Sequence, residues 1–459
     1  MPDTRKHALA ICLTAAFMAG LDVSIVNVAL PSIREGVPDA SEAGLQWILS
    51  GYALTFGLLL VPAGRLGDAR GRRTVFTWGV TMFTLSSAAC GLASTMPVLI
   101  AARLVQGLAA GMINPQVSGL IQQMFRGAER GRAFGALGAT IGVSTAAGPL
   151  IGGALVSAFG AEHGWRLVFL VNVPIGLVLV PLAHRILPAP SPAKEGRRQT
   201  MDPVGVLLLG TAVTLFLLPF IQQHQWAGAA KWLLVPASLA LLAVFVAWER
   251  RYRGEPVVDL SLFRMRSYGL GTAIAMFYFA GFTGIFFIFT LYLQSGLDYS
   301  ALLAGLAITP FAVGSAGAAV AGGRLVSRVG RKVVVAGLVT VVGGLLATIA
   351  ATYFVPGPHV ALATALPLLV AGIGSGLTIA PNQAVTLSQV PTAGGGSAAG
   401  VLQTGQRLGS AIGIAAAGSL FFGALGQGWP SAFRHGLMVV VAFVCAALLA
   451  ALYDLLRRS

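Results

Sequence analysis

The sequence predicts an all-α integral membrane protein, and three observations support that prediction. The chain has 459 residues, of which 56% are hydrophobic and only 10% are charged, whereas a soluble domain carries about 25% charged residues. Its mean hydropathy is +0.81. The apolar runs are long enough to cross a bilayer as helices, unlike the alternating strands of about ten residues found in an outer-membrane barrel.

Fourteen apolar runs reach the length of a membrane-spanning helix, which needs about 20 residues. Their many glycines and prolines are tolerated in such helices. Twelve spans are the alternative if one apolar pair is misassigned, and the even count would survive. The candidate spans are residues 8–30, 46–64, 74–94, 97–121, 133–158, 166–187, 203–222, 232–248, 269–293, 299–322, 333–354, 360–386, 399–423 and 435–453.

The basic residues orient these spans. With the N-terminus inside, 24 of the 30 Lys and Arg residues fall on the inner side, 4 on the outer side and 2, Arg103 and Arg407, inside spans. Basic loops face the cytoplasm in multi-pass proteins, so we expect both termini there. The same rule explains the net charge of +15, and we expect no nucleic-acid partner. The N-terminus runs straight into the first span without a convincing small-residue cleavage site, so we expect an uncleaved helix rather than a signal peptide.

A repeat relates the first six spans to the last six. Residues 64–73, after span two, match residues 323–332, after span ten, at glycine, leucine and basic positions. Parallel halves related by an axis along the membrane normal are a transporter architecture, with the site near the midplane. We therefore expect a six-helix half at 1–187, cytoplasmic linkers plus two inserted helices at 188–266, and a second six-helix half at 267–459.

Four motifs point to a known family. Residues 64–73 read GRLGDARGRR, and span four carries RLVQG at 103–107. Span five carries AGPLIGG at 147–153, and span one carries LDVSIVNVALP at 21–31. In their order and placement these motifs resemble the major facilitator superfamily, and within it the fourteen-span drug:proton antiporter family.

The resemblance implies a major facilitator fold of fourteen helices arranged 6+2+6 in two pseudo-symmetric halves. It implies a proton-coupled antiporter that exports lipophilic drugs, antibiotics or toxic metabolites by alternating access. The proton gradient would be its energy source, without a cofactor. Its expected partners are a small lipophilic substrate, protons and the lipid bilayer, and a monomer is the family default. Ala, Gly and Arg outweigh Lys, which is typical of a GC-rich bacterial genome and indicates a bacterial plasma membrane.

Other function classes fit less well. A proton-coupled symporter that imports a small nutrient on the same fold is the alternative, and the span-five motif argues against it. An enzyme is not expected, because the sequence has no HExxH, paired carboxylates, nucleophile elbow or phosphate-binding loop. Cys12, Cys90 and Cys445 lack metal-ligand spacing, so we expect no metal site.

Asp22 is the one acidic residue well inside a predicted span, where a carboxyl costs roughly 2.5–3.5 kcal/mol at the bilayer centre. At a rise of about 1.5 Å per residue, Asp22 lies about 12 Å, and Arg103 about 9 Å, from the outer face. The resemblance implies that spans one and four are neighbours, so we predict that the two interact, directly or through water or Gln106, and carry the coupled proton. Arginine favours the ionised carboxyl and apolar burial favours the neutral form. A static ion pair that only holds helices together is the alternative.

The resemblance also implies a gate. Asp68 would meet Arg72 or Arg132 and the N-terminus of span thirteen near 396–397, where a carboxylate is favoured. Ser327 stands at the equivalent position of the second copy, so we expect a latch on one side only. Small residues in span five would allow close approach to a helix of the other half, as a seal or hinge; a plain glycine-packed helix is the alternative. The gating candidates are Gly64, Asp68, Gly71, Arg72, Arg132, Gly148, Pro149, Gly152 and Gly153.

The substrate pocket should be mostly apolar with a few polar anchors. Polar residues near helix breaks and aromatic residues of span nine are the natural lining. Arg407 is either a substrate or structural contact or a side chain that snorkels to the membrane surface. The candidates are Asn27, Gln106, Asn114, Gln116, Phe277, Phe286, Asn382, Gln383 and Arg407.

Overall fold

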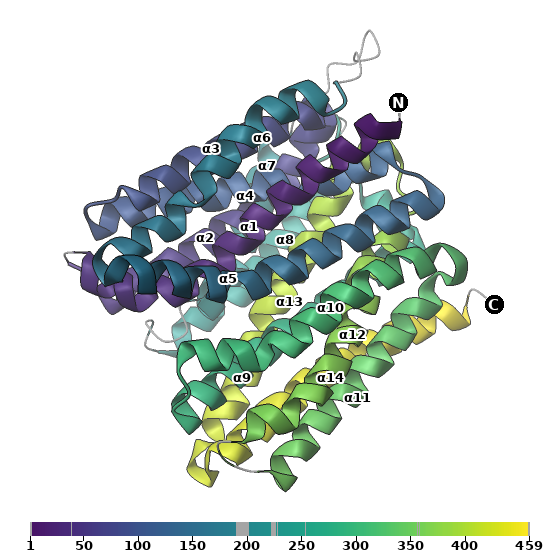
Figure 1. Cartoon of the computed structure of the whole chain (residues 1–459). Coiled ribbons are helices and arrows are strands. Elements are labelled where there is room, and N and C mark those ends of the chain that lie inside the picture. Colours follow the sequence, from purple (N-terminus) through teal and green to yellow (C-terminus); the bar gives the residue numbers. More distant parts are fainter. Residues whose placement is uncertain are drawn as a thin grey trace. The chain divides into compact units, whose positions relative to one another are not determined.

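The computed structural model describes residues 2–37, 39–189, 202–221, 226, 228–252, 254–355, 357 and 359–457. Within these residues the chain forms fourteen α-helices and no strand, and Figure 1 shows the helices in sequence colours. Helices satisfy their own backbone hydrogen bonds, which a lipid environment demands. Most of the predicted linker, residues 190–201, lies outside the described part. The helices are α1 (Pro2–Gly36), α2 (Glu42–Arg70), α3 (Arg72–Gly91), α4 (Met96–Met124), α5 (Gly127–Leu170), α6 (Asn172–Ile186), α7 (Pro203–Ile221), α8 (Leu234–Arg251), α9 (Arg266–Leu291), α10 (Ala301–Val329), α11 (Arg331–Phe354), α12 (Val360–Thr386), α13 (Gly395–Gly423) and α14 (Trp429–Leu456).

Every predicted span coincides with helix, but not every helix is equally apolar. In the described residues, 12 helical segments are long and apolar enough to cross a membrane. The segments that fall short are α3, which begins with two arginines and is rich in Thr and Ser, and α13, which carries Gln403, Gln406 and Arg407. The chain is a multi-pass membrane protein, and the count of fourteen crossings stays a prediction.

The boundary between predicted spans five and six falls where it is expected, between residues 158 and 166. Two helical segments of α5 meet there at Gly160, whose φ of 76° and ψ of 166° are not helical. Side chains with a Cβ rarely adopt this left-handed backbone, and glycine adopts it freely. The second break comes later, at Val171, between α5 and α6.

The predicted repeat is visible in the turns at the ends of α2 and α10. Ser41 caps α2 by accepting the Gly44 N–H at 3.1 Å, and Ser300 caps α10 by accepting the Leu303 N–H at 3.3 Å. Gly71 ends α2 with a φ of 98°, and Gly330 ends α10 with a φ of 56°. The two copies therefore share helix starts and stops, because serine caps and left-handed glycines recur in register.

The described chain divides into two compact units. The first comprises residues 1–124, 147–262 and 390–404. In it α4 packs against α1, α2 and α3, α6 packs against α1 and α3, and the inserted pair α7–α8 attaches through α2. Its largest buried side chain is Trp165, which lies edge-on to Phe169.

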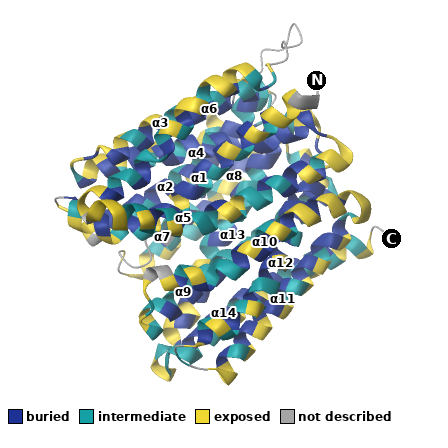
Figure 2. Cartoon of the chain, in the orientation of Figure 1, coloured by how far each residue is buried: buried dark blue, intermediate teal, exposed yellow. Residues whose placement is uncertain are grey.

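The second unit comprises residues 125–146, 263–389 and 405–459. Here α12 packs between α10 and α11, and α14 packs against α9 and α11. Its core is aromatic: Tyr278, Phe289 and Tyr292 are buried, and Tyr292 stacks on Phe433 at 4.6 Å between ring centroids. Figure 2 shows helices with buried faces and exposed faces, as expected where one side of a helix meets protein and the other meets lipid or water.

The units cut across the predicted halves at two places. The first part of α5 groups with the second unit, and the first part of α13 groups with the first unit. Each sequence half therefore contributes the N-terminal part of one helix to the compact unit that consists mainly of the other half. The predicted boundaries at residues 187 and 267 stay a prediction.

Candidate functional site

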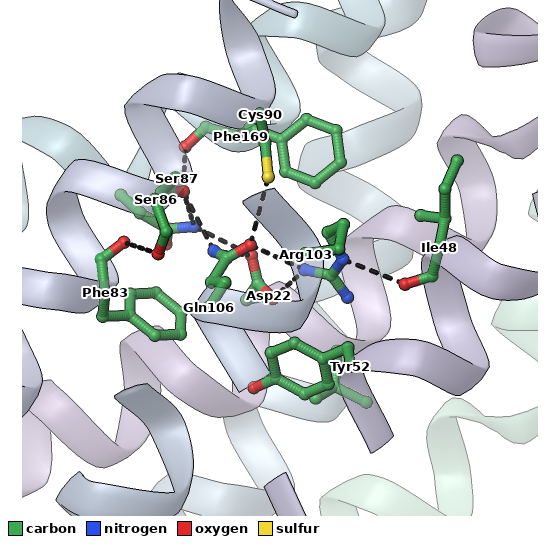
Figure 3. Close-up of polar contacts among 12 residues, drawn as sticks. Asp22, Ile48, Tyr52, Phe83, Ser86, Ser87, Cys90, Arg103, Gln106 and Phe169 are labelled. Carbon is green, nitrogen blue, oxygen red and sulfur yellow. Dashed lines mark hydrogen bonds and ion pairs between the residues drawn. The ribbon is translucent and has the colours of Figure 1, made fainter. Parts of the chain in front are cut away.

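The carboxyl group of Asp22 is completely buried on α1 and is held by three side-chain donors. Arg103 NH1 lies 2.7 Å from Oδ2, and Gln106 Nε2 lies 2.9 Å from Oδ1. Asn172 Nδ2, at the start of α6, donates to Oδ1 at 3.1 Å. Figure 3 shows Arg103 and Gln106, both from α4, pointing at this carboxyl. The contact predicted from similar depth and from the family resemblance is therefore made directly.

A second layer of contacts fixes these donors. Ser87 Oγ accepts from Gln106 Nε2 and from Asn172 Nδ2, both at 3.1 Å. Ser87 in turn donates to the Phe169 carbonyl at 2.8 Å. Because one hydroxyl orients two of the three donors, the amides have little freedom to turn away from Asp22 (Figure 3).

The guanidinium of Arg103 is held independently of Asp22. Its Nε donates to the Ile48 carbonyl at 3.1 Å, and NH1 also donates to Gln106 Oε1 at 2.9 Å. The ring of Tyr52 lies 4.3 Å from the guanidinium carbon. Aromatic faces attract such cations, most strongly where water is excluded. The arginine therefore has other favourable contacts and does not depend on the carboxylate alone.

The guanidinium and the two amides together supply this carboxylate with three hydrogen-bond donors, one of them charged. A proton arriving at Asp22 would remove the attraction for Arg103 and replace an acceptor by a donor. Protonation would therefore require the local network to rearrange. All of these groups come from the first unit.

The sequence missed two parts of this network. Neither Asn172 nor Ser87 was singled out as a site residue from the sequence. Both are polar side chains in apolar spans, which is the signal that could have identified them. Their direction toward Asp22 follows from helix packing, which sequence spacing does not give.

The predicted gate residues also meet. Asp68 accepts from Arg72 NH2 at 2.7 Å and Nε at 3.1 Å. Its carboxylate also accepts the Gly396 N–H at 3.0 Å and the Ser397 N–H at 2.8 Å, in the first turn of α13. The Asp68 side chain is only 1% exposed. A carboxylate at a helix N-terminus meets unpaired amides and the positive end of the helix dipole.

Arg72 links this contact to two more segments. Its NH1 donates to the Gly119 carbonyl of α4 at 2.7 Å, and NH2 donates to the Thr392 carbonyl just before α13. Gln122 Nε2 donates to the Gly395 carbonyl at 3.3 Å. Arg132, the other predicted partner of Asp68, is an exposed residue of α5 in the second unit.

Backbones approach closely at the same place. A Cβ on Gly396 would lie 2.6 Å from the Gly64 oxygen, a separation that real Cβ atoms essentially never show. The equivalent crossing joins α5 and α10, where a Cβ on Gly131 would lie 2.5 Å from the Gly323 oxygen. Both crossings need glycine, as close helix contacts commonly do.

Two span-five glycines pack against a helix of their own half: a Cβ on Gly148 or Gly152 would meet Ser24 or Ile25 of α1. The expected approach of this motif to a helix of the other half stays a prediction. A Cβ on Gly153 would meet nothing within 4 Å. The approach of α5 to the other half lies earlier, at Gly131, because that end of the helix belongs to the second unit. Pro149 is half-buried on the same helix.

The amides predicted to line a substrate pocket mostly join helices. Gln116 Nε2 donates to the Ala63 carbonyl at 2.7 Å, and Gln106 belongs to the Asp22 network. Asn382 Nδ2 donates to the Gly271 carbonyl at 2.9 Å. Asn27 and Asn114 bond within their own helices, at 3.2 Å and 3.1 Å. Their roles as substrate contacts stay predictions.

The remaining pocket candidates divide by exposure. Phe277 and Phe286 are half-buried, and Phe286 lies 5.3 Å from Phe311 between ring centroids. Gln383 is buried, whereas Arg407 is exposed. No group of three His, Cys, Asp or Glu side chains that could hold a metal ion occurs in the described residues.

A buried charge cluster in the second unit was missed. Arg331, counted as a loop residue, is only 1% exposed, and its Nε lies 2.8 Å from Asp454 Oδ2 on α14. It also donates to Asn382 and, at 3.2 Å, to the Ser267 carbonyl. Arg331 occupies the same position in its repeat as Arg72, a correspondence that could have marked it.

Comparison with known proteins agrees with this architecture. The profile of the Major Facilitator Superfamily matches residues 12–414 and 272–459. The chain belongs to the Major Facilitator Superfamily. Among solved structures, the human organic anion transporter MFSD10 superposes with a TM-score of 0.67 at 14% identity, covering 97% of this chain and 99% of that one. The proton:xylose symporter XylE superposes with a TM-score of 0.65 at 16% identity, covering 98% and 95%. These two likenesses show the fold.

Several relatives share more sequence identity with this chain than those two solved structures do. One is named a probable actinorhodin transporter of Streptomyces coelicolor; it is 38% identical over 92% of this chain and 73% of its own length. The multidrug resistance protein Stp of Mycobacterium tuberculosis is 34% identical over 88% of this chain and 73% of that protein. The puromycin resistance protein pur8 of Streptomyces alboniger is 31% identical over 98% of this chain and 90% of that protein.

Proposed function

We propose that this chain is a proton-coupled antiporter that exports lipophilic antibiotics, drugs or toxic metabolites across the bacterial plasma membrane. The named relatives support export, since they are called transporters or resistance proteins for antibiotics and drugs. The proposal places it in the fourteen-span family, arranged 6+2+6, as a monomer with both termini in the cytoplasm and no cofactor.

One observation carries the proton coupling: Asp22 is fully buried and paired with Arg103 at 2.7 Å. An ionisable group inside a membrane helix is by default a functional site. In the proposed cycle a proton from outside neutralises Asp22 and frees Arg103 to keep its contacts with Ile48 and Tyr52. Re-formation of the ion pair then expels the proton on the other side.

Asp68 is the proposed latch of the cycle. Its bonds to Gly396 and Ser397 join α2 of one half to α13 of the other. Alternating access requires such contacts to form in one state and break in the other. We propose that this contact closes the cytoplasmic side, and that protonation of Asp22 lowers the cost of releasing it.

The test is export of ethidium, puromycin and other amphiphilic compounds from cells that carry wild type or Asp22→Asn, with and without an uncoupler. Wild type should keep the compounds out until the uncoupler is added, and Asp22→Asn should lose at least roughly tenfold in export, about 1.4 kcal/mol or more of coupling. The matched control is Asp298→Asn, the same change at an exposed residue whose left-handed backbone asparagine accepts.

The amount of each variant in the membrane must be equal for the comparison to count. Export that is unchanged in a folded Asp22→Asn variant would leave the Asp22–Arg103 pair as a static contact. Uncoupler-sensitive accumulation of a compound inside the cells would instead indicate the importing symporter.

A further inference from the structure

Two buried carboxyl groups meet on the inserted helix pair. Asp202 stands directly before α7 and is 1% exposed, and Glu249 lies near the end of α8 and is 6% exposed. A Cβ on Gly205 would lie 2.5 Å from Asp202 Oδ2 and 3.0 Å from Glu249 Oε1. These two oxygens are therefore no farther apart than the sum of the two distances, 5.5 Å. The residues are 47 positions apart, which is why the sequence shows no carboxylate pair.

The hydrogen bonds of the two groups differ. Asp202 accepts from the Val204 N–H at 3.1 Å and from the indole N–H of Trp248 at 2.6 Å. Glu249 Oε1 accepts the Val257 N–H at 3.1 Å, and the Val258 N–H also faces this carboxyl. The buried Oε2 accepts no hydrogen bond of normal geometry. An ionised oxygen buried without a donor is strongly disfavoured, whereas a protonated carboxyl needs no donor there.

Nearby charge does not compensate this oxygen. Among the described residues, the charged side chains that face Glu249 are Asp202 from the start of α7 and Arg65 from α2. Arg65 is already paired with Glu255, in the segment after α8. Arg250 and Arg251, next along α8, are exposed. If all three carboxylates were ionised, one guanidinium would face three negative charges.

We propose that Asp202 and Glu249 form a second proton-binding site, which holds one proton between them and is separate from Asp22. Like charges this close disfavour double ionisation, so a carboxyl pair retains a proton that a single carboxyl would lose. A metal ion fits less well, because hard cations take six or more oxygen ligands and this pair offers few. Within the pair the proton resides mainly on Glu249, whose Oε2 accepts no hydrogen bond of normal geometry.

This site gives the inserted helices a role. Arg65 lies three residues before the latch residue Asp68, one turn away on α2. When the proton leaves to water, Asp202 and Glu249 are both negatively charged and compete with Glu255 for Arg65. A shift of Arg65 toward them would displace α2 next to Asp68. The inserted pair thus makes the latch sensitive to proton concentration at that end of the protein. The binding site itself does not depend on the proposed export.

Infrared difference spectroscopy of the purified protein tests the site. Wild type at neutral pH should show the carbonyl-stretching band of a protonated carboxylic acid, and Glu249→Gln should lack it. Asp202→Asn should shift this band to another frequency, because the shared partner is gone. Glu129→Gln, an exposed carboxyl on α5, is the matched control and should leave the band unchanged. A band that persists in Glu249→Gln would overturn the proposal.

Thermal unfolding provides a second measurement. It compares how the melting temperature changes with pH in each variant, so a variant that is merely less stable at every pH does not mimic the expected result. Glutamine mimics the neutral acid in shape, so Glu249→Gln should fold. The melting temperature of wild type should fall from mildly acidic to mildly alkaline pH, as the buried pair becomes doubly charged, and that of Glu249→Gln should fall less. Equal pH profiles, or a wild-type profile that sodium ions flatten and potassium ions do not, would contradict a proton site, the latter by indicating a bound cation.

Discussion

Two helix crossings in this protein share a backbone design and differ in charge. In the first unit α2 crosses α13 at Gly64 and Gly396, and in the second unit α10 crosses α5 at Gly323 and Gly131. The glycines correspond in the repeat. Beside the first crossing Asp68 binds two amides of α13. The close approach is therefore a property of the repeated fold, and the charge is an addition to one copy.

The arginines that follow each crossing show the same divergence. Arg72, the first residue of α3, pairs with Asp68 four residues earlier, in the last turn of α2. Arg331 has only Ser327 at that position, whose hydroxyl donates to its own helix, and it pairs instead with Asp454 of α14. The first copy uses its carboxylate to join the halves, and the second uses one to join helices within a half. This asymmetry suits a latch at the first crossing and a fixed brace in the second unit.

The largest effects should come from filling the crossings. Gly323→Ala would place a Cβ 2.5 Å from the Gly131 oxygen, and both backbones would have to separate. We expect export to fall by up to roughly a hundredfold, since overpacking typically costs about 1–3 kcal/mol and this clash involves backbone on both sides. The control is Gly317→Ala on the same helix, where the Cβ meets nothing within 4 Å. Equal export by the two variants would show that the crossing tolerates a wider spacing.

Breaking the brace should cost stability more than transport. Asp454→Asn leaves Arg331 buried beside a neutral partner, and removing one member of a buried pair costs about 3–5 kcal/mol. Thermal unfolding should show a lower melting temperature, and the double variant Arg331→Met/Asp454→Leu should recover much of it. A single variant as stable as wild type would mean that this pair is not a brace.

Removing the latch charge should affect export without unfolding the protein. Asp68→Asn weakens two bonds from backbone amides and two from Arg72, each worth about 1.5–3 kcal/mol when charged. We expect roughly a tenfold loss of export, because part of this energy is present in only one state of the cycle. Ser327→Ala is the matched change at the other crossing and should have little effect. If both variants behave alike, the charge difference between the crossings has no function.

The smallest effect should come from Gly153→Leu. A side chain there enters open space in this state, so expression and stability should stay near wild type. Export should fall by a few-fold if α5 must pass another helix in a different state. Export at the wild-type rate would show that Gly153 does not contribute to a seal between α5 and another helix.

The sequence predicted the contacts of the site that follow from the depth of a residue in the membrane and from its place in a family motif. Asp22 and Arg103 were paired because both are charges at similar depth, and Asp68 was placed at the start of α13 by motif. The structure makes both contacts. Hydropathy, helical rise and charge bias give the depth of each residue along the chain. Which helices are neighbours came from the family resemblance.

Other parts depend on packing and were not predictable in this way. Arg331 was counted as a basic loop residue, because the positive-inside rule treats all arginines alike. Its side chain is buried because Asp454 of α14 lies against the first turn of α11. Glu249 and Asp202 meet only because α7 and α8 pack together.

The central claim, that Asp22 couples a proton to export, is tested most directly in proteoliposomes containing the purified protein. Two quantities should be measured with ethidium: accumulation driven by an imposed pH gradient, and exchange across the membrane with no gradient. Wild type should do both, and Asp22→Asn should exchange ethidium but fail to accumulate it. Accumulation driven by the pH gradient in the Asp22→Asn variant would contradict the account.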